Sequence, residues 1–351
     1  MKITKIFLSL LVIAMGFPTL AMGQDKNSKA IFVKKPGTLI SELTLAEAKN
    51  VTHLTLTGKI NAIDFKNLRD DFKNIEVLDI SAVEIRNYVG KKGTLDQFHV
   101  YTANSVPSHA FSEQTDYNPV PRTALKKVIL PLGLKSIDKF AFANCPNLEI
   151  LICTGGEAPS LTENALSPQR TAIFVPAGCR ENYSQKKNWE HFAIIDSEPV
   201  RASIILDKTD DLANELLKQG IQPKNVNFLT LSGQADADDL KIIRDYMTNL
   251  VYIDMRNTNT AEIPEYTFAQ KTNLLTVYLP DNLKTIGLRA FDNCNKLGPT
   301  LLLPASLTSI GFGAFINCNS LDVVQALGNK ITAIGENLFG QDSENRLVYA
   351  N

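Results

Sequence analysis

A repeat of 23 to 24 residues constrains the fold of this chain more than any other feature of its sequence. Residues 125–148, 274–297 and 297–321 share the pattern L-x-x-V-x-L-P-x-x-L-x-x-I-x-x-x-A-F-x-x-C-x-x-L, and a looser copy covers 321–347. A unit this short cannot bury its own apolar side, so each copy must stack on its neighbours. The sequence therefore predicts an α/β repeat solenoid.

Each copy predicts one turn of that solenoid. The opening Val-x-Leu is a short strand whose alternation sends one side chain inward and the next outward. A proline follows the strand at Pro131, Pro280 and Pro304, and it ends the strand because it has no N–H for the ladder. The Ile, Ala-Phe and Cys positions then turn the chain back and fill the interior.

A larger duplication contains these repeats. Residues 51–81 align without gaps to 226–256, at an offset of 175. Upstream, 35–43 matches 208–216, and both stretches predict a short helix that caps the open end of a stack. The first copy carries two extra segments, at about 84–105 and 113–124. We expect two tandem modules, residues 24–199 and 200–351.

The two modules are predicted to end differently. Residues 171–195 indicate a C-terminal cap: a strand, a turn at Pro176-Ala177-Gly178, a helical stretch, then Trp189 and Phe192 to cover the last turn. The second module reaches only Leu347-Val348-Tyr349-Ala350-Asn351, where such a cap would begin, and is therefore expected to lack one.

The first 23 residues predict a signal peptide. Lys2 and Lys5 precede an apolar stretch at 6–15, and Ala21-Met22-Gly23 supplies small residues for cleavage before Gln24. The apolar stretch is too short for a membrane span, and no later stretch reaches 18 apolar residues. We expect an exported protein, secreted, periplasmic or at the cell surface, with no membrane span in the mature chain.

The repeats resemble the BspA-like leucine-rich repeats of Bacteroidetes and some other microbes. The AFxxC segments at 141–145, 290–294 and 314–318 carry the match, with the strand and proline before them. The resemblance implies a leucine-rich-repeat fold of short parallel strands. It also implies surface display or adhesion, which in some members is adhesion to host matrix proteins.

Composition and motifs argue against catalysis. The formal net charge of −1 gives no basic footprint for nucleic acid. The four histidines lie in no metal or nucleophile motif, and the glycine pairs are too sparse for a phosphate loop. Asp70-Asp71 and Asp238-Asp239 are interpreted as solvated helix faces. We expect no enzyme, no metal and no cofactor.

The five cysteines are predicted to be free thiols, although exported proteins favour disulfides. Their number is odd, and Cys145, Cys294 and Cys318 share one repeat position, where a small apolar side chain packs against the next turn. Cys153 falls on an inward strand position, and Cys179 is the cysteine expected to be most exposed.

The predicted binding face is the outward side of the second module's strands. Outward residues recur every 24 residues, and adjacent strands lie about 4.8 Å apart, so they should form two ladders. The face comprises Phe228, Thr230, Tyr252, Asp254, Thr276 and Tyr278, followed by Thr300 and Leu302. The same face of the first module carries His53, Thr55, Val77, Asp79, Lys127 and Ile129. A second predicted site is the inserted loop with Tyr88, Phe98 and Tyr101.

Aromatic side chains among polar neighbours are typical of protein and sugar recognition, although aromatics also simply suit strands. The leading hypothesis is a non-enzymatic module that binds an extracellular or cell-surface protein. The alternatives are a glycan-binding module and a structural envelope scaffold.

Overall fold

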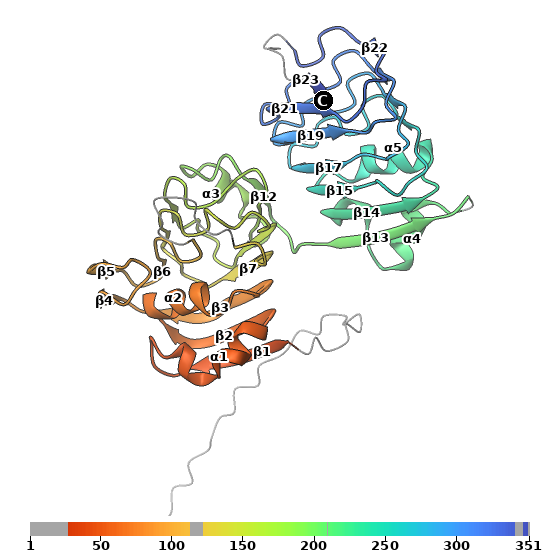
Figure 1. Cartoon of the computed structure of the whole chain (residues 1–351). Helices are drawn as coiled ribbons and strands as arrows, with labels where there is room; N and C mark the ends of the chain where they lie inside the picture. Colours follow the sequence, from red (N-terminus) through yellow and green to blue (C-terminus); the bar gives the residue numbers. More distant parts are fainter. Residues whose placement is uncertain (1–26, 113–121, 209, 341–346, 350–351) are drawn as a thin grey trace, which may run out of the picture.

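A computed structural model describes residues 27–112, 122–208, 210–340 and 347–349. It shows two stacks of short strands, one red to yellow and one green to blue (Figure 1). The predicted signal peptide and most of the second predicted insertion, 113–124, lie outside the described residues.

The first stack is built on a seven-stranded parallel sheet. Its strands, in spatial order, are β1 (Ser28–Val33), β2 (His53–Ile60), β3 (Val77–Ile85), β7 (Lys127–Leu130), β9 (Ile150–Cys153), β11 (Ala172–Phe174) and β12 (Ala193–Ile195). A second parallel ladder, formed at the repeat's Ile position, comprises β6 (Ser105–Val106), β8 (Ser136–Ile137) and β10 (Ser160–Leu161). The turns that contribute to both ladders therefore pair with their neighbours twice.

The second stack repeats this plan, but its main face is divided into two sheets. The first contains β13 (Arg201–Leu206), β14 (Phe228–Gly233), β15 (Tyr252–Asp254) and β17 (Thr276–Tyr278). The second contains β19 (Thr300–Leu303), β21 (Val323–Ala326) and β23 (Leu347–Tyr349). The short ladder is continuous, through β16 (Glu262–Ile263), β18 (Thr285–Ile286), β20 (Ser309–Ile310) and β22 (Ala333–Ile334).

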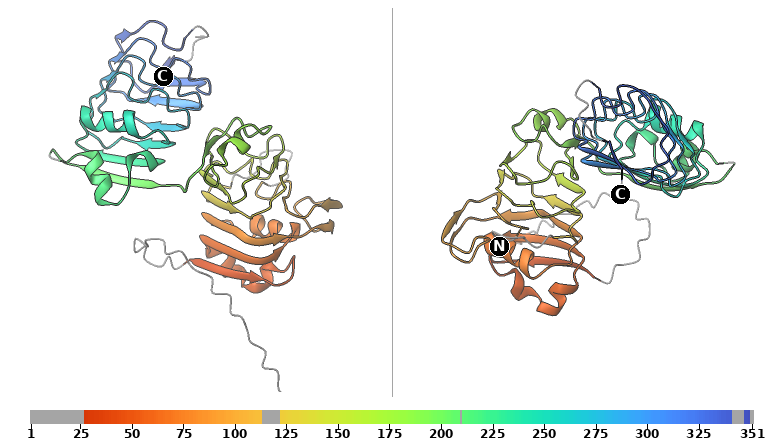
Figure 2. Two further views of the ribbon diagram at one scale, coloured as in Figure 1. Left: turned by 180° about the vertical axis from the view of Figure 1, so that it is seen from behind. Right: turned by 45° about the horizontal axis from the view of Figure 1, so that its top comes forward.

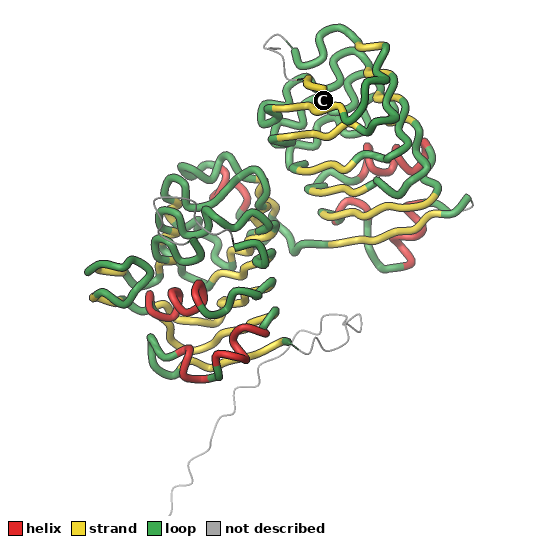
Figure 3. Tube along the Cα trace, in the orientation of Figure 1, coloured by secondary structure: helices red, strands yellow, loops and turns green. Residues whose placement is uncertain are grey.

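Helices flank the first turns of each stack, and loops replace them in later turns (Figure 3). They are α1 (Leu45–Asn50) and α2 (Ala62–Asp70) in the first stack, with α4 (Leu212–Lys218) and α5 (Ala237–Tyr246) in the second. The short helix predicted over 208–216 corresponds to α4, and a short helix is also present within 35–43. A 3-10 turn, Leu39–Glu42, occupies part of that range, and α1 begins later because Thr44 and Glu47 form a capping box.

The interior is filled by the repeat's aromatic position, as predicted. The rings of Phe268, Phe291, Phe315 and Phe339 stack in sequence, with centroids 5.0, 5.4 and 5.7 Å apart. Phe291 and Phe315 are fully buried. Since each ring covers the next, every turn depends on its neighbours for burial.

The two stacks end differently. In the first, α3 (Arg180–Ser184) and the residues after it cover the last turn, with Tyr183 and Trp189 fully buried. The Trp189 indole N–H donates to Pro159 O at 2.8 Å. In the second, Ile334 is 47% exposed, whereas the equivalent Ile310 is 1% exposed. The last described turn of the second stack therefore leaves apolar surface open.

The second stack begins beside the end of the first, and the chain crosses between them after β12 (Figures 1 and 2). Buried residues from both sides form one cluster: Ile150, Ala172, Phe174, Ala193 and Ile195 from the first stack, and Phe228, Val251 and Leu275 from the second. The Lys296 ammonium also donates to Phe192 O across this contact. The two sheet faces thus meet at a packed crease.

Candidate functional site

The outward residues of the second stack form two ladders, as the repeat spacing predicts. Phe228 pairs with Tyr252, and Tyr252 with Thr276, along the first ladder. Thr230, Asp254 and Tyr278 pair in the same way along the second.

Phe228 does not face solvent, so this part of the predicted face is wrong. Phe228 is only 4% exposed, and its ring stacks on Phe174 of the first stack with centroids 6.1 Å apart. The Arg201 guanidinium lies 4.2 Å from the ring centroid and pairs with Glu149 at 2.6 Å. The end of the first stack covers this corner of the sheet.

The open part of the face centres on Tyr278, which is 37% exposed. The Tyr252 ring meets it edge-on at 5.7 Å, and the Arg256 guanidinium lies 4.5 Å from its centroid. Arg256 also binds Asp254 through two nitrogens, with Nη2 to Oδ2 at 2.6 Å and Nε to Oδ1 at 3.0 Å. Arg256 therefore joins two of the predicted residues, Asp254 and Tyr278, although the repeat spacing gave no signal for it.

These contacts determine the charge states on the face. Burial alone raises the pKa of Asp254, but hydrogen bonds from Arg256 outweigh it and lower that pKa overall. The same hydrogen bonds raise the pKa of Arg256. Burial raises the pKa of Tyr252 to about 12, so its hydroxyl stays protonated at neutral pH. The face thus carries a fixed ion pair and a neutral Tyr252.

Beside Tyr278 the face is hollowed, with a volume of about 370 Å³. The hollow lies where β17 ends one sheet and β19 begins the next. Gly298 and Pro299 line it, and Pro299 has no N–H to give the preceding strand. Gly298 sits so close to the next turn that a Cβ would lie 2.0 Å from Ser320 O. Only glycine fits this approach.

The hollow takes residues from both stacks. Arg170 comes from the first, and Asp281, Leu302 and Leu327 come from the second. Leu302 is 44% and Leu327 48% exposed, which gives the hollow an apolar side. The repeat pattern placed Leu302 on the face but carried no signal for Arg170.

The inserted loop forms a hairpin, β4 (Tyr88–Gly90) and β5 (His99–Tyr101), that projects from the first stack (Figure 1). Tyr101 is 5% exposed, and its hydroxyl accepts Leu95 N–H at 2.9 Å, so its predicted availability for binding is wrong. Tyr88 stacks on Tyr101 with centroids 5.8 Å apart and is half-buried. Of the three predicted loop residues, only Phe98 is well exposed, at 62%.

Comparison with known proteins identifies the repeats. The family described as BspA type leucine-rich repeat region matches this chain in six copies, over residues 121–178 and 245–349. The chain contains BspA-type leucine-rich repeats over these residues. No curated protein matches it.

Two solved structures, of a leucine-rich repeat protein and of a vaccine antigen, are similar to this one. A leucine-rich repeat protein from Bacteroides ovatus is 13% identical with a TM-score of 0.25, covering 92% of this chain and 76% of that one. The pneumococcal vaccine antigen PcpA is 15% identical with a TM-score of 0.24, covering 82% and 67%. These values are too low for either protein to indicate a ligand for this chain.

The cysteine position that recurs in the repeats is a buried donor. The thiols of Cys294 and Cys318 lie 2.9 and 3.1 Å from Phe268 O and Phe291 O of the preceding turns. Burial raises the pKa of Cys145 and of Cys153 to about 12, and raises that of Cys294 as well. All five cysteines are free, as predicted, and Cys179 alone is half-buried.

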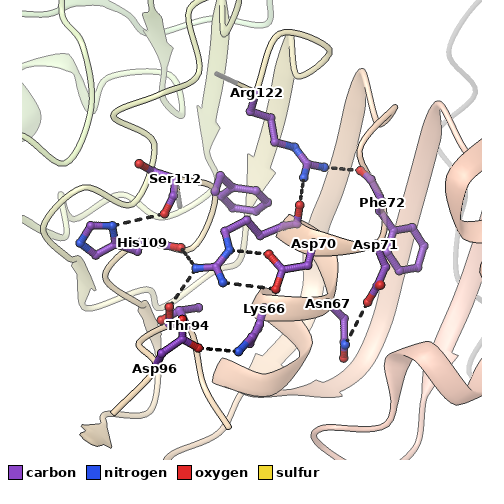
Figure 4. A network of polar contacts seen from close by, with 12 residues as sticks. Lys66, Asn67, Asp70, Asp71, Phe72, Thr94, Asp96, His109, Ser112 and Arg122 are labelled. Atoms are coloured by element: carbon purple, nitrogen blue, oxygen red, sulfur yellow. Dashed lines mark hydrogen bonds and ion pairs between the residues drawn. The ribbon is translucent and has the colours of Figure 1, made fainter. Parts of the chain in front are cut away.

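The paired aspartates make local contacts, and their interpretation as solvated faces is wrong for Asp239. Asp239 is 4% exposed and accepts Leu212 N–H at 2.8 Å. Asp70 pairs with Arg69 at 2.7 Å, and Asn67 donates to Asp71 at 3.2 Å (Figure 4). Asp238 is exposed.

Arg69 extends this network to the first inserted segment. It donates to Thr94 O at 2.8 Å and to His109 O at 3.1 Å (Figure 4). The network therefore ties the first insertion to α2. Among the described residues, no group of three His, Cys, Asp or Glu side chains is placed to hold a metal ion.

Proposed function

We propose that this protein is an exported, non-enzymatic binding protein that takes a protein partner on the open sheet face of its second stack. The observation that carries the proposal is the hollow beside Tyr278. Its volume of about 370 Å³ lies within the size of small binding clefts, roughly 300–1,000 Å³. Its exposed leucines offer apolar surface that the fold itself does not need.

The surroundings of the hollow suit a protein interface. Binding energy concentrates in a few apolar or aromatic anchors surrounded by polar groups that exclude water. Here Leu302, Leu327 and Tyr278 supply the anchors, and the Asp254–Arg256 pair supplies a fixed polar border. Because that pair is already formed, a partner would not have to order it.

The chemistry of the hollow favours binding over catalysis. Its charged lining residues are Arg170, Arg256 and Asp281, a set with neither a nucleophile beside a base nor a histidine. The buried thiols elsewhere have raised pKa values, which disfavours the reactive thiolate.

Export is supported by the sequence at the amino terminus and by the family, whose members are typically surface or secreted proteins. Within the described part of the chain, no helix has the length and apolar character to cross a membrane.

A glycan is the second candidate, favoured by an exposed tyrosine beside a carboxylate and a guanidinium. Sugars stack on open ring faces, and Arg256 covers one face of Tyr278 at 4.5 Å. This leaves less ring surface for a sugar than for an apolar side chain, so we place the protein partner first.

The test is a binding screen followed by footprinting. The mature chain is screened against a panel of extracellular matrix proteins and a glycan array, and the bound form is examined by amide hydrogen exchange. We expect a protein ligand that protects residues 276–281 and 298–304. Protection confined to other segments would contradict the proposed site. Binding to glycans alone would support the second candidate, and no binding in either screen would favour an envelope scaffold.

A further inference from the structure

The hollow beside Tyr278 has one cation available to a ligand. The charge of Arg256 is held by Asp254 through two short hydrogen bonds, and its guanidinium face lies against Tyr278. Arg170 is exposed and forms no ion pair with any residue that the structure describes. A guanidinium without an ion-pair partner binds a carboxylate through two parallel hydrogen bonds. Lysine cannot form this bidentate geometry.

Arg170 is held in place by the first stack. The next residue, Thr171, is buried, and its hydroxyl donates to Leu148 O at 2.7 Å. The backbone N–H of Ala172 donates to Glu149 O at 2.9 Å, which starts strand β11. The base of the Arg170 side chain is therefore fixed, although its guanidinium is free.

The contact between the stacks fixes Arg170 relative to the hollow. Phe174 stacks on Phe228, and Arg201 reaches Glu149 at 2.6 Å. Pro168 and Gln169, just before Arg170, line a neighbouring groove together with Lys296 of the second stack. An arginine from one stack is thus presented at the edge of a hollow in the other.

Apolar side chains line much of the rest of the hollow, which also includes Asp281. Leu302 and Leu327 are about half exposed, and Pro299 and Pro304 line the same hollow. Binding is favoured when a partner removes exposed apolar surface of this kind from water. A ligand that fits must therefore carry an apolar group close to an anionic one.

We propose that the hollow binds an extended segment of a partner protein that carries a carboxylate next to a large apolar side chain. The carboxylate pairs with Arg170, and the apolar side chain packs on Leu302 and Leu327. This inference rests on the proposed function and adds the chemistry of the bound segment. Arg170 is a specificity-determining residue in it, because an amide in place of the carboxylate leaves the guanidinium unpaired.

The test uses a displayed library of random linear peptides, selected on the full mature chain. We expect selected peptides to carry Asp, Glu or a free carboxyl terminus within a few residues of a large apolar side chain. Arg170→Gln should weaken these peptides about 10- to 100-fold, the range for a lost hydrogen bond to a charged group. Arg180→Gln is the matched control, because Arg180 is exposed on the first stack and does not line the hollow.

A second arm separates charge pairing from an effect on folding. A peptide in which the acid is replaced by its amide should bind the native chain as weakly as the acidic peptide binds Arg170→Gln. The two changes together should cause no further loss, since they remove the same contact. Additive losses would contradict the pairing.

The outcomes also distinguish this inference from the function on which it rests. Peptides without an acid, unaffected by Arg170→Gln but lost with Leu302→Asp, would overturn the carboxylate assignment and leave the hollow as the binding site. Peptides whose binding changes with neither variant would overturn both proposals. A selection that yields no peptide bound at the hollow would also overturn both.

Discussion

Arg122 and Lys271 close equivalent helices in the two stacks. Arg122 donates to Arg69 O at 2.7 Å and to Phe72 O, at the end of α2. Lys271 donates to Arg244 O at 3.2 Å and to Met247 O at 3.1 Å, at the end of α5. Cations suit this position because the last carbonyls of a helix have no partner within it.

Lys271 stands three residues after the repeat's phenylalanine, where the later turns have cysteine. In those turns the thiol donates to a single carbonyl of the preceding turn. Beneath Lys271 the preceding turn ends in a helix, so more carbonyls need a donor. The residue three positions after the repeat's phenylalanine therefore depends on whether the preceding turn ends in a helix or in a loop.

Lys271→Met should reveal a pH-dependent contribution of this lysine. Burial lowers the pKa of Lys271 from 10.5 to about 8. Between these values the unfolded chain binds a proton that the folded chain has released, so the stability of the native chain rises with pH. Relative to Lys271→Met, we expect the native chain to gain on the order of 2–3 kcal/mol from pH 8 to pH 10.5. Urea unfolding at several pH values measures this, and a difference that is constant across the range would contradict it.

Thiol reactivity should follow burial. In the folded chain Cys179 alone should react readily, because the other four thiols are buried. After denaturation without reductant, all five should react with a thiol reagent. Titration of only one thiol in the denatured protein would mean that two disulfides exist and that the free-thiol assignment is wrong.

The repeat spacing predicted what depends on local stacking. It placed Phe291 and Phe315 inside, and it placed Tyr252, Asp254 and Tyr278 in register, because neighbouring turns share one geometry. The burial of Phe228 could not be predicted in this way. It depends on how the link between the stacks directs the second stack, which has no periodic signal.

One irregularity in the repeat spacing marks the position of the hollow, but the spacing alone does not predict that a hollow forms there. Leu297 and Pro304 are one residue further apart than Leu274 and Pro280, and the difference is the Gly298-Pro299 step. The position of Arg170 left no trace at all, because it comes from a different stack. Periodicity therefore locates the face, and contacts between stacks complete the site.

Inward and outward aromatics should differ in their effect on stability. Phe291→Ala removes a fully buried ring between two stacked neighbours and should cost about 3–5 kcal/mol. Tyr278→Ala, at a side chain 37% exposed, should cost much less. Denaturant unfolding of both variants measures this, and equal losses would mean that the Tyr278 ring is part of the core.

The end of the second stack should open before the end of the first. Ile334 is 47% exposed and Phe339 is half-buried, whereas Trp189 and Phe192 are buried beneath the first stack's last loop. Turns with few buried contacts open at lower free energy. Amide hydrogen exchange should therefore be faster in residues 329–340 than in 172–195. Equal protection would indicate that a second copy or a partner covers this end.

The binding role of the hollow is tested most directly by the dissociation constant of a partner recovered in the screen, measured with Leu302→Asp and Leu132→Asp. Both leucines are exposed, Leu302 at 44% in the hollow and Leu132 at 74% on the first stack, so neither change should disturb folding. We predict that Leu302→Asp weakens binding about tenfold or more and that Leu132→Asp leaves it unchanged. Unchanged binding by a folded Leu302→Asp variant would contradict the account and would make the hairpin around Phe98 the next site to test.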